Sequence, residues 1–315
     1  LLADDFKINR DDEKWIQSKL ADAHLIYSEK SISNTKDLRA LKKLNRNDWD
    51  IPNINLPNSL EIITWNCEFF PHANDSTILA LAEAVLDLDA DIIAFQEIRR
   101  VGWFSKLMEY LPAYDYIVSK QASFMDLAII YKSEIFNLIR QYEPFSEDDY
   151  NFAGRPPLQA DFKMEIGEEE KHFSVINLHM KCCDSGLLRR KKASQMLHNY
   201  LNENYNKQSN ILVLGDWNDD TKDEPGQHCF EPFFQDKRFY FTTKHISMDI
   251  SQASYPKEPY VSFLDHIMVS EDLLPSTSSY DISTLPMGKF MGGYHIYDAY
   301  ISDHLPVMLS FSVTN

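Results

Sequence analysis

The sequence predicts an α/β fold in which strands and helices stack in layers around sheets. From Leu60 onward, short apolar runs rich in Ile, Val and Phe alternate with longer stretches whose apolar residues recur at helical spacing. The chain has 315 residues, 44% of them hydrophobic, which is enough for a large buried core. No uninterrupted apolar run approaches the roughly 20 residues that a membrane-spanning helix needs.

The N-terminal part has a different composition. Residues 1 to about 50 are polar, and one amphipathic helix is expected between Asp11 and Lys30. Residues 50–59 contain two prolines and three asparagines, as is typical of a linker. We therefore expect an N-terminal helical extension and linker over residues 1–59, and a second domain over residues 60–315. The chain begins with Leu rather than Met, as expected of a start that has been processed or trimmed.

Periodicity beyond residue 60 predicts eight strands and two helices. The first helix is expected to run to Asp89 with Ser76 or Thr77 as its N-cap, and the second from about Leu187 to Asn204. The strands are expected at residues 60–66, 91–97, 127–131, 158–166, 173–179, 211–216, 263–270 and 307–313.

Charge and cysteine content restrict the function. The net charge of −17 weighs against a protein that grips phosphate backbones tightly and without specificity. It weighs less against an enzyme that meets its substrate briefly through a bound cation. The four cysteines are too few for a disulfide framework. Cys67 is expected to be a buried thiol, and a bridge from Cys182 or Cys183 to Cys229 is left open.

Polar residues able to bind a metal, a phosphate or a proton stand at the ends of the predicted strands. Any one of them could be a turn residue or a helix cap. Six such strand ends in one chain instead favour a shared active site, because layered α/β folds build sites from residues that converge from several strands. These residues are Asn66, Glu97, His179, Asp216 with Asn218, Asp265, and Asp303 with His304.

These segments resemble the endonuclease/exonuclease/phosphatase superfamily, which includes pancreatic-type DNases, abasic-site endonucleases, neutral sphingomyelinases and inositol-polyphosphate phosphatases. The resemblance covers about residues 60–313. It implies a four-layer α/β sandwich of two packed mixed β-sheets flanked by helices. The matching motifs are Trp65-Asn66, Gln96-Glu97, Asn177-Leu178-His179, Gly215-Asp216-Trp217-Asn218, Leu264-Asp265-His266-Ile267 and Ser302-Asp303-His304-Leu305-Pro306-Val307.

A narrower group within this superfamily, made up of secreted bacterial proteins, is also similar to the chain. The similarity lies in His179-Met-Lys-Cys-Cys, in the Arg189-Arg190 helix, and in Met291-Gly-Gly-Tyr ahead of Tyr297-Asp298. It implies a secreted or periplasmic location.

The resemblance implies a divalent cation, Mg²⁺ or Mn²⁺ with Ca²⁺ also allowed. Such an ion would polarise the phosphoryl oxygens during in-line attack of water. Hard cations prefer carboxylate oxygen, so Glu97 is the first ligand expected and Asp303 the second, with Asn66 beside them.

The remaining family positions imply roles in proton transfer and phosphate binding. Asp216 matches the residue that positions the attacking water, and Asn218 would donate a hydrogen bond to the developing charge. His304 would act as general acid–base or bind the scissile phosphate, with Asp265 orienting its ring. The roles of Asp216 and His304 could be exchanged. His179 and Arg155 match residues that meet the phosphate.

Several neighbours are open to two interpretations. Glu68 could support the site or be solvated, and Lys181 could meet phosphate or lie on the surface. Arg99 and Arg100 would form a cationic rim beside Glu97. The charge run from Arg189 to Lys192 is expected to be a solvated helix face. Trp103, Phe104 and Trp217 lie near site segments but are expected in the core.

The function expected first is endonucleolytic cleavage of DNA, and also of RNA, by a monomer with no stable membrane association and no obligate protein partner. One alternative is a phosphomonoesterase or phospholipase C-like enzyme acting on inositol phosphates or sphingomyelin. Another is an inactive binding module. The binding module is disfavoured because every expected site position is filled.

Overall fold

Two β-sheets packed face to face form the centre of the computed structural model, which describes residues 49–99, 101–166, 169–205 and 209–313. The first sheet has the order β11-β12-β1-β2-β4-β3. Within it, β1 pairs in parallel with β2 and antiparallel with β12. Its strands are β1 (Ser59–Phe70), β2 (Ile92–Ile98), β3 (Tyr114–Val118), β4 (Asp126–Lys132), β11 (Tyr280–Thr284) and β12 (Val307–Ser312).

The second sheet has the order β5-β6-β7-β8-β10-β9. The parallel pairing of β7 with β8 sets His179 beside Asp216, and the antiparallel pairing of β8 with β10 sets Asp216 beside Asp265. Register alone therefore gathers three of the predicted site residues. The strands are β5 (Phe136–Tyr142), β6 (Leu158–Ile166), β7 (Glu169–His179), β8 (Ile211–Asp216), β9 (Phe239–Phe241) and β10 (Asp265–Ser270).

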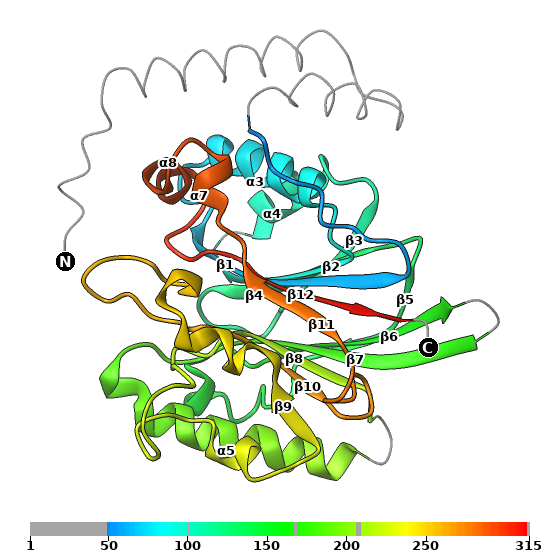
Figure 1. The fold of residues 1–315 in the computed structure, drawn as a ribbon, viewed down its shortest axis with the longest axis vertical. Helices are drawn as coiled ribbons and strands as arrows, with labels where there is room; N and C mark the ends of the chain where they lie inside the picture. The colour runs from blue at the N-terminus through cyan, green and yellow to red at the C-terminus, as the bar shows by residue number, and fades with distance from the viewer. Residues whose placement is uncertain (1–48, 100, 167–168, 206–208, 314–315) are drawn as a thin grey trace, which may run out of the picture. The chain divides into compact units, whose positions relative to one another are not determined.

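Helices cover the outer faces of both sheets (Figure 1). The helices α3 (Asp75–Leu88), α4 (Val101–Met108), α7 (Met287–Phe290) and α8 (Tyr294–Tyr300) lie on the side of the first sheet. The helices α5 (Leu187–Asn204) and α6 (Glu231–Phe234) lie on the side of the second. The predicted four-layer α/β sandwich is confirmed. No helix of the described ranges is both long and apolar enough to cross a bilayer.

Apolar side chains fill the space between the layers. One cluster lies between the two sheets and includes Ile62, Ile129, Val175 and Leu212. A second joins the other face of the second sheet to α5, through residues such as Ile176 and Leu197. Strand β8 contributes alternate residues to both clusters, which explains why all six of its residues are buried.

A buried polar bridge joins the sheets beneath the site. Gln96 on β2 donates from Nε2 to Asn177 Oδ1 on β7 over 2.8 Å. Asn177 Nδ2 in turn donates to the carbonyls of Phe95 and Ala128 at 2.9 and 3.0 Å. The two side chains satisfy each other across the sheets, so they fix how β2 and β7 face each other.

Several details differ from the sequence prediction. Helix α3 begins at Asp75 with Asn74 as N-cap residue, so the cap predicted at Ser76 or Thr77 is wrong; Thr77 Oγ1 instead accepts from the Ala73 amide. The prediction missed the helices α4, α6, α7 and α8, the short 3-10 segments, and the strands β3, β5, β9 and β11. The helix expected between Asp11 and Lys30 lies outside the described residues. The boundary expected after residue 59 stays a prediction.

Candidate active site

Four predicted site residues meet at the irregularity of β1 and at the ends of β2, β7 and β8. Asn66 Nδ2 donates to Asp216 Oδ2 over 3.0 Å and to Glu97 Oε1 over 3.3 Å. His179 Nε2 lies 3.4 Å from the same Asp216 oxygen and 3.8 Å from Glu97 Oε1. Asn66, His179 and Asp216 are buried, whereas the Glu97 side chain is partly exposed.

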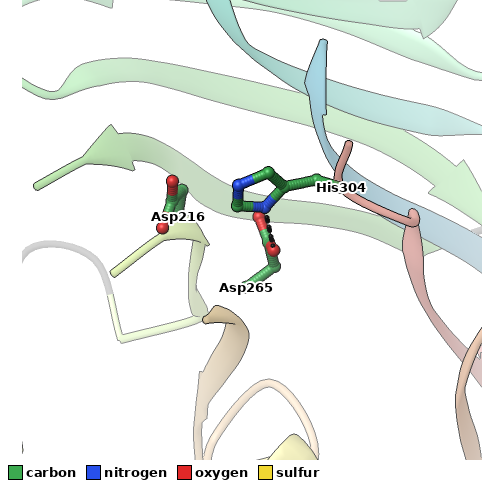
Figure 2. Close-up of side chains that lie close together, drawn as sticks. All are labelled: Asp216, Asp265 and His304. Atoms are coloured by element: carbon green, nitrogen blue, oxygen red, sulfur yellow. Dashed lines mark hydrogen bonds and ion pairs between the residues drawn. The ribbon is translucent and has the colours of Figure 1, made fainter. Parts of the chain in front are cut away.

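A second pair completes this cluster. His304, in the loop before β12, contacts Asp265 at the start of β10, with 2.7 Å between Nδ1 and Oδ2. Figure 2 shows the imidazole ring held between Asp265, on its Nδ1 side, and Asp216. The ring also lies 5.0 Å from the ring of Tyr255, measured between centroids. Because Nδ1 is engaged, Nε2 is the ring atom left to face a substrate.

The two histidines differ in charge. Burial opposes the charged form of His304, but the Asp265 carboxylate outweighs it and raises the pKa of His304 well above its usual value. Burial lowers the pKa of His179 well below its usual value, and the nearby charges of Arg155 and His304 act in the same direction. The site therefore holds one imidazolium and one neutral imidazole near neutral pH.

Asp216 is the carboxylate most affected by its surroundings. Burial, reinforced by the neighbouring Asp265 charge, raises the pKa of Asp216 to about 7. Its Oδ1 accepts the Asn218 amide over 2.8 Å, while Oδ2 faces Asn66 and His179. A carboxyl group that titrates near neutral pH can take up and release a proton at working pH.

Local backbone geometry turns these side chains toward one another. Glu97 has φ of 63° and Asn218 has φ of 52°, both in the left-handed region. The pairing of β1 with β2 is irregular between Asn66 and Phe70, so β1 bends at the site. Such local strain is typical of functional positions, where the surrounding packing holds it in place.

Arg155 and Asn218 approach the site from the side of β7. Both donate to the carbonyl of Met180, Arg155 from Nη2 over 2.9 Å and Asn218 from Nδ2 over 3.2 Å. Arg155 Nε and His179 Nδ1 are buried and have no hydrogen-bond partner among the described residues. A guanidinium N–H that is held in this way is suited to an anion that completes its bonding.

Asp303 lies in a different group from Asn66 and Glu97. Its carboxylate is 3.7 Å from Lys257 Nζ, and its main-chain amide donates to Glu68 Oε2 over 3.2 Å. Lys257 also contacts Asp298 at 3.3 Å. Burial, followed by the charge of Asp303, raises the pKa of Glu68 to about 7, so negative charge is in excess here. Glu68 therefore belongs to the site edge rather than to the solvated surface.

The donor set fits a hard divalent cation. Oxygens dominate the site, and burial together with the charge of a neighbouring carboxylate raises the pKa values of Glu68 and Asp216. Asp216, Asp265 and His304 form the tightest group, with one ligand atom of each within 4.8 Å of the others. We favour Glu97 as the ligand instead, because the Nδ1 atom of His304 is already bonded to Asp265 and a charged imidazole repels a cation.

The orientation of Asn66 matters for this ligand set. Its Nδ2, not its Oδ1, faces Glu97 and Asp216, while Oδ1 accepts the Glu68 amide over 3.0 Å. Binding a cation through Oδ1 would require the amide to turn over. The ligands Glu97, Asp303 and Asn66 therefore remain a prediction.

Other predictions about neighbouring residues can be compared with the structure. Phe104 and Trp217 are buried in the core, as expected, and Cys67 is a buried thiol. The core position expected for Trp103 is wrong, because its side chain is only half-buried and Lys106 lies over its ring. The solvated face expected from Arg189 to Lys192 is wrong at Arg190, which is buried and bonded to both Asp219 oxygens. All four cysteines are free, so the bridge to Cys229 is not formed.

Sequence reasoning missed three contributors. Tyr255 and Lys257 reach His304 and Asp303 from the loop before β10, and nothing in their local pattern marks them. Tyr297 OH accepts from Trp65 Nε1 over 2.8 Å and donates to the His304 carbonyl, so it ties the His304 loop to β1. The only sequence feature that pointed to Tyr297 was its place in the Tyr297-Asp298 stretch, one of the segments similar to secreted bacterial proteins.

Comparisons with known proteins agree with this fold. The sequence profile of the Endonuclease/Exonuclease/phosphatase family matches residues 63–304. No curated protein matches the chain.

Several solved structures share the fold. A D. rerio TDP2 complexed with a single-strand DNA product is 13% identical, with a TM-score of 0.60 over 80% of this chain and 98% of that one. The human Nocturnin catalytic domain with a bound sulfate anion is 16% identical, with a TM-score of 0.58 over 83% and 97%. A Bacteroides thetaiotaomicron mannosyl-6-phosphatase is 16% identical, with a TM-score of 0.56 over 79% and 98%. Identities this low show the fold alone.

Proposed function

The chain belongs to the endonuclease/exonuclease/phosphatase family, whose members are metal-dependent phosphoric ester hydrolases, and from this premise we propose that it is a phosphodiesterase acting on nucleic acid. The observation that carries the proposal is the meeting of Asp216, His179 and the His304–Asp265 pair at one point. A general base, a neutral phosphate donor and a charged acid are then available together.

The charge states assign the proton transfers. The raised pKa of His304 supports the role of acid for this residue: it presents its Nε2 proton to the leaving oxygen and stabilises the negative charge that develops there. Asp216 takes the proton of the attacking water. Arg155, His179 and Asn218 hold the non-bridging phosphate oxygens. A cation held by Glu97, Asp303 and Asn66, Mg²⁺ or Mn²⁺, would polarise those oxygens.

A cationic and aromatic surface beside Arg155 supports a polymeric substrate. Arg189 donates to the main-chain carbonyl of Tyr150, which lies five residues before Arg155 in the chain. Arg189 Cζ stacks 4.2 Å from the centre of the Tyr150 ring, and Tyr150 is 67% exposed. An exposed aromatic ring with a cation upon it is suited to a base and its flanking phosphate.

Monoester hydrolysis is the second candidate. It is favoured by the shared fold with a mannosyl-6-phosphatase and by the small number of cations around the site. For a phosphate monoester or an inositol phosphate, the Tyr150–Arg189 surface would contribute little, because no second nucleotide reaches it. A location outside the cytoplasm is also part of the proposal and rests on the similarity to secreted bacterial proteins.

The test is a substrate panel of supercoiled plasmid, RNA, sphingomyelin and inositol phosphates, each with Mg²⁺, with Mn²⁺ and with a chelator. We expect metal-dependent nicking that Asp216→Ala and His304→Ala abolish. Tyr150→Ala and Arg189→Ala should slow cleavage of polymers but not of a small chromogenic diester. Arg140→Ala is the matched control, because Arg140 also stacks on a tyrosine, Tyr142, but on the outer strand β5. Activity on lipid or inositol substrates only would reject the nuclease.

A further inference from the structure

Two adjacent thiols follow the site histidine on β7. Cys182 is half-buried, Cys183 is exposed, and their sulfur atoms lie 2.9 Å apart. A disulfide bond is about 2.05 Å long, so closure would bring the sulfurs only about 0.9 Å nearer. The other two cysteines, Cys67 and Cys229, are fully buried and take no part in this pair.

We propose that Cys182 and Cys183 are a redox-modification site. A small-molecule disulfide oxidises the two thiols to a disulfide bond between these adjacent residues, and this bond weakens phosphate binding at the neighbouring site. The formation of the bond is independent of the function proposed above. Only the effect of the bond on phosphate binding rests on the proposed function.

The reaction with a disulfide such as oxidised glutathione balances in two exchanges. The Cys182 thiolate attacks one sulfur of the oxidant, which releases one thiol and leaves a mixed disulfide on Cys182. Cys183 then loses its proton, attacks Cys182 Sγ and releases the second thiol. The protein loses two protons and two electrons, and the oxidant takes up both to become two thiols.

Contacts around the pair support this order of attack. Cys182 Sγ accepts from Lys181 Nζ over 3.3 Å and from the Cys183 thiol. That donated hydrogen bond, together with burial, raises the pKa of Cys183, so Cys183 keeps its proton while Cys182 reacts. The pair therefore has a first nucleophile and a resolving thiol.

The bond should be easily reversed. Neighbouring Cα atoms are 3.80 Å apart, closer than the roughly 4.4–6.8 Å of ordinary disulfides. Cys183 already has φ of 69°, in the left-handed region. A ring closed between adjacent residues is strained, and strained, exposed disulfides are the readily reduced ones.

The same segment anchors the phosphate-binding side of the site. Its Met180 carbonyl accepts from Arg155 and Asn218. Its Lys181 and Cys183 carbonyls both accept from Arg190 Nη1, at 2.9 and 2.7 Å. Closing the ring turns the peptide groups between Lys181 and Cys183, so it disturbs this anchoring and with it the Arg155 guanidinium.

The first test measures the bond itself in the full chain. After complete reduction, the protein is treated with oxidised glutathione, alkylated and mapped by mass spectrometry. We expect the peptide with both residues to lose two hydrogen atoms, to carry no glutathione and to resist alkylation until reductant is added. Cys67 and Cys229, alkylated only after denaturation, are internal controls. Stable glutathione adducts, bonds between two chains, or freely alkylated Cys182 and Cys183 would overturn the proposal.

The second test measures the consequence. Calorimetry with inorganic phosphate should show several-fold weaker binding to the oxidised protein, with recovery on reduction. The Cys182→Ser and Cys183→Ser variants should each bind phosphate as the reduced protein does, and treatment with the oxidant should leave this affinity unchanged. Equal affinity in both redox states would overturn the link to the site. No phosphate binding in either state would reject both the proposed function and the link between oxidation and phosphate binding. The mass measurement would still show whether the disulfide bond forms.

Discussion

Ser302 Oγ donates a 2.6 Å hydrogen bond to the main-chain carbonyl of Asn66, which lies 236 residues earlier in the chain. The same oxygen accepts the amide of His304 over 3.0 Å. One buried hydroxyl thus joins the end of β1, which carries Asn66, to the loop that carries His304. This bond continues the antiparallel pairing of β1 with β12, which ends at Thr64 and Val307, up to the site residues themselves.

Replacing Ser302 by Ala should therefore affect catalysis as well as stability. The variant leaves a buried carbonyl and a buried amide without a partner, which costs about 1–3 kcal/mol of unfolding free energy. It also releases the His304 loop, so kcat/KM should fall. Both quantities are measurable by urea denaturation and by steady-state hydrolysis of a chromogenic diester.

Ser310→Ala is the matched control for that experiment. Ser310 is also a buried serine of the same C-terminal segment, and its Oγ donates to Glu61 over 2.8 Å, at a place where no site residue lies. It should lose stability but keep its kcat/KM. Equal loss of activity in both variants would mean that Ser302 has no special positioning role.

Gly215 should tolerate no side chain. It has φ of 146°, and a Cβ atom there would lie 1.9 Å from the Leu178 carbonyl oxygen, between the strands that carry His179 and Asp216. Gly215→Ala should lower the unfolding free energy by about 3 kcal/mol, because it combines overpacking with an unfavourable backbone conformation. Denaturation midpoints measure the loss. A Cβ atom added at Gly102 in α4 would have no other atom within 4 Å. Gly102→Ala should therefore raise the unfolding free energy by about 0.5–1 kcal/mol.

The Asp265–His304 pair predicts a change in pH dependence. Asp265 raises the pKa of His304, so the imidazolium persists to higher pH than in a free histidine. In Asp265→Asn that pKa falls, the imidazolium is lost at lower pH, and the alkaline limb of the kcat/KM profile should move to lower pH. The maximal rate should fall by roughly 10²-fold, the lower end of what a positioned acid contributes. An alkaline limb that stays in place would show that His304 is not the acid.

Strands enclosed by the fold were predictable, and edge strands were not. The predicted bounds of β6, β8 and α5 agree with the structure because each presents a continuous apolar face to the core. Most residues of the edge strands β5 and β11 are half-buried or exposed, and they gain strand structure from pairing with a neighbour rather than from an apolar run. Propensity for such strands depends on context that the local sequence lacks.

The site residues were identified by resemblance, but their contacts required the fold. Six strand ends could be predicted to converge, whereas the position of Asp303 beside Lys257 rather than Glu97 could not. Arg190 is similar: its helical neighbours are charged, and its partner Asp219 lies 29 residues away. A run of charged residues does not reveal which of them is buried, because the burial of a charge depends on a partner far away in the sequence.

The metal site leads to a prediction that separates two candidate ligand sets. If Glu97 holds the cation, Glu97→Gln should weaken Mn²⁺ binding, measured by calorimetry, by on the order of 10²-fold or more, and should reduce metal-dependent hydrolysis in parallel. If the ion instead lies among Asp216, Asp265 and His304, Glu97→Gln should bind Mn²⁺ normally, and Asp265→Asn should not.

Glu143→Gln controls for the structural part of the Glu97 change. Glu97 accepts the Phe69 amide over 3.0 Å, and Glu143 likewise accepts the amides of Lys120 and Gln121, at 2.7 and 2.9 Å. Both variants weaken a bond from a carboxylate to the main chain, so both should lose a similar amount of stability. Only Glu97→Gln removes a negative charge from the site, so a loss of Mn²⁺ affinity confined to it would assign the ligand by its charge rather than by a disturbed fold.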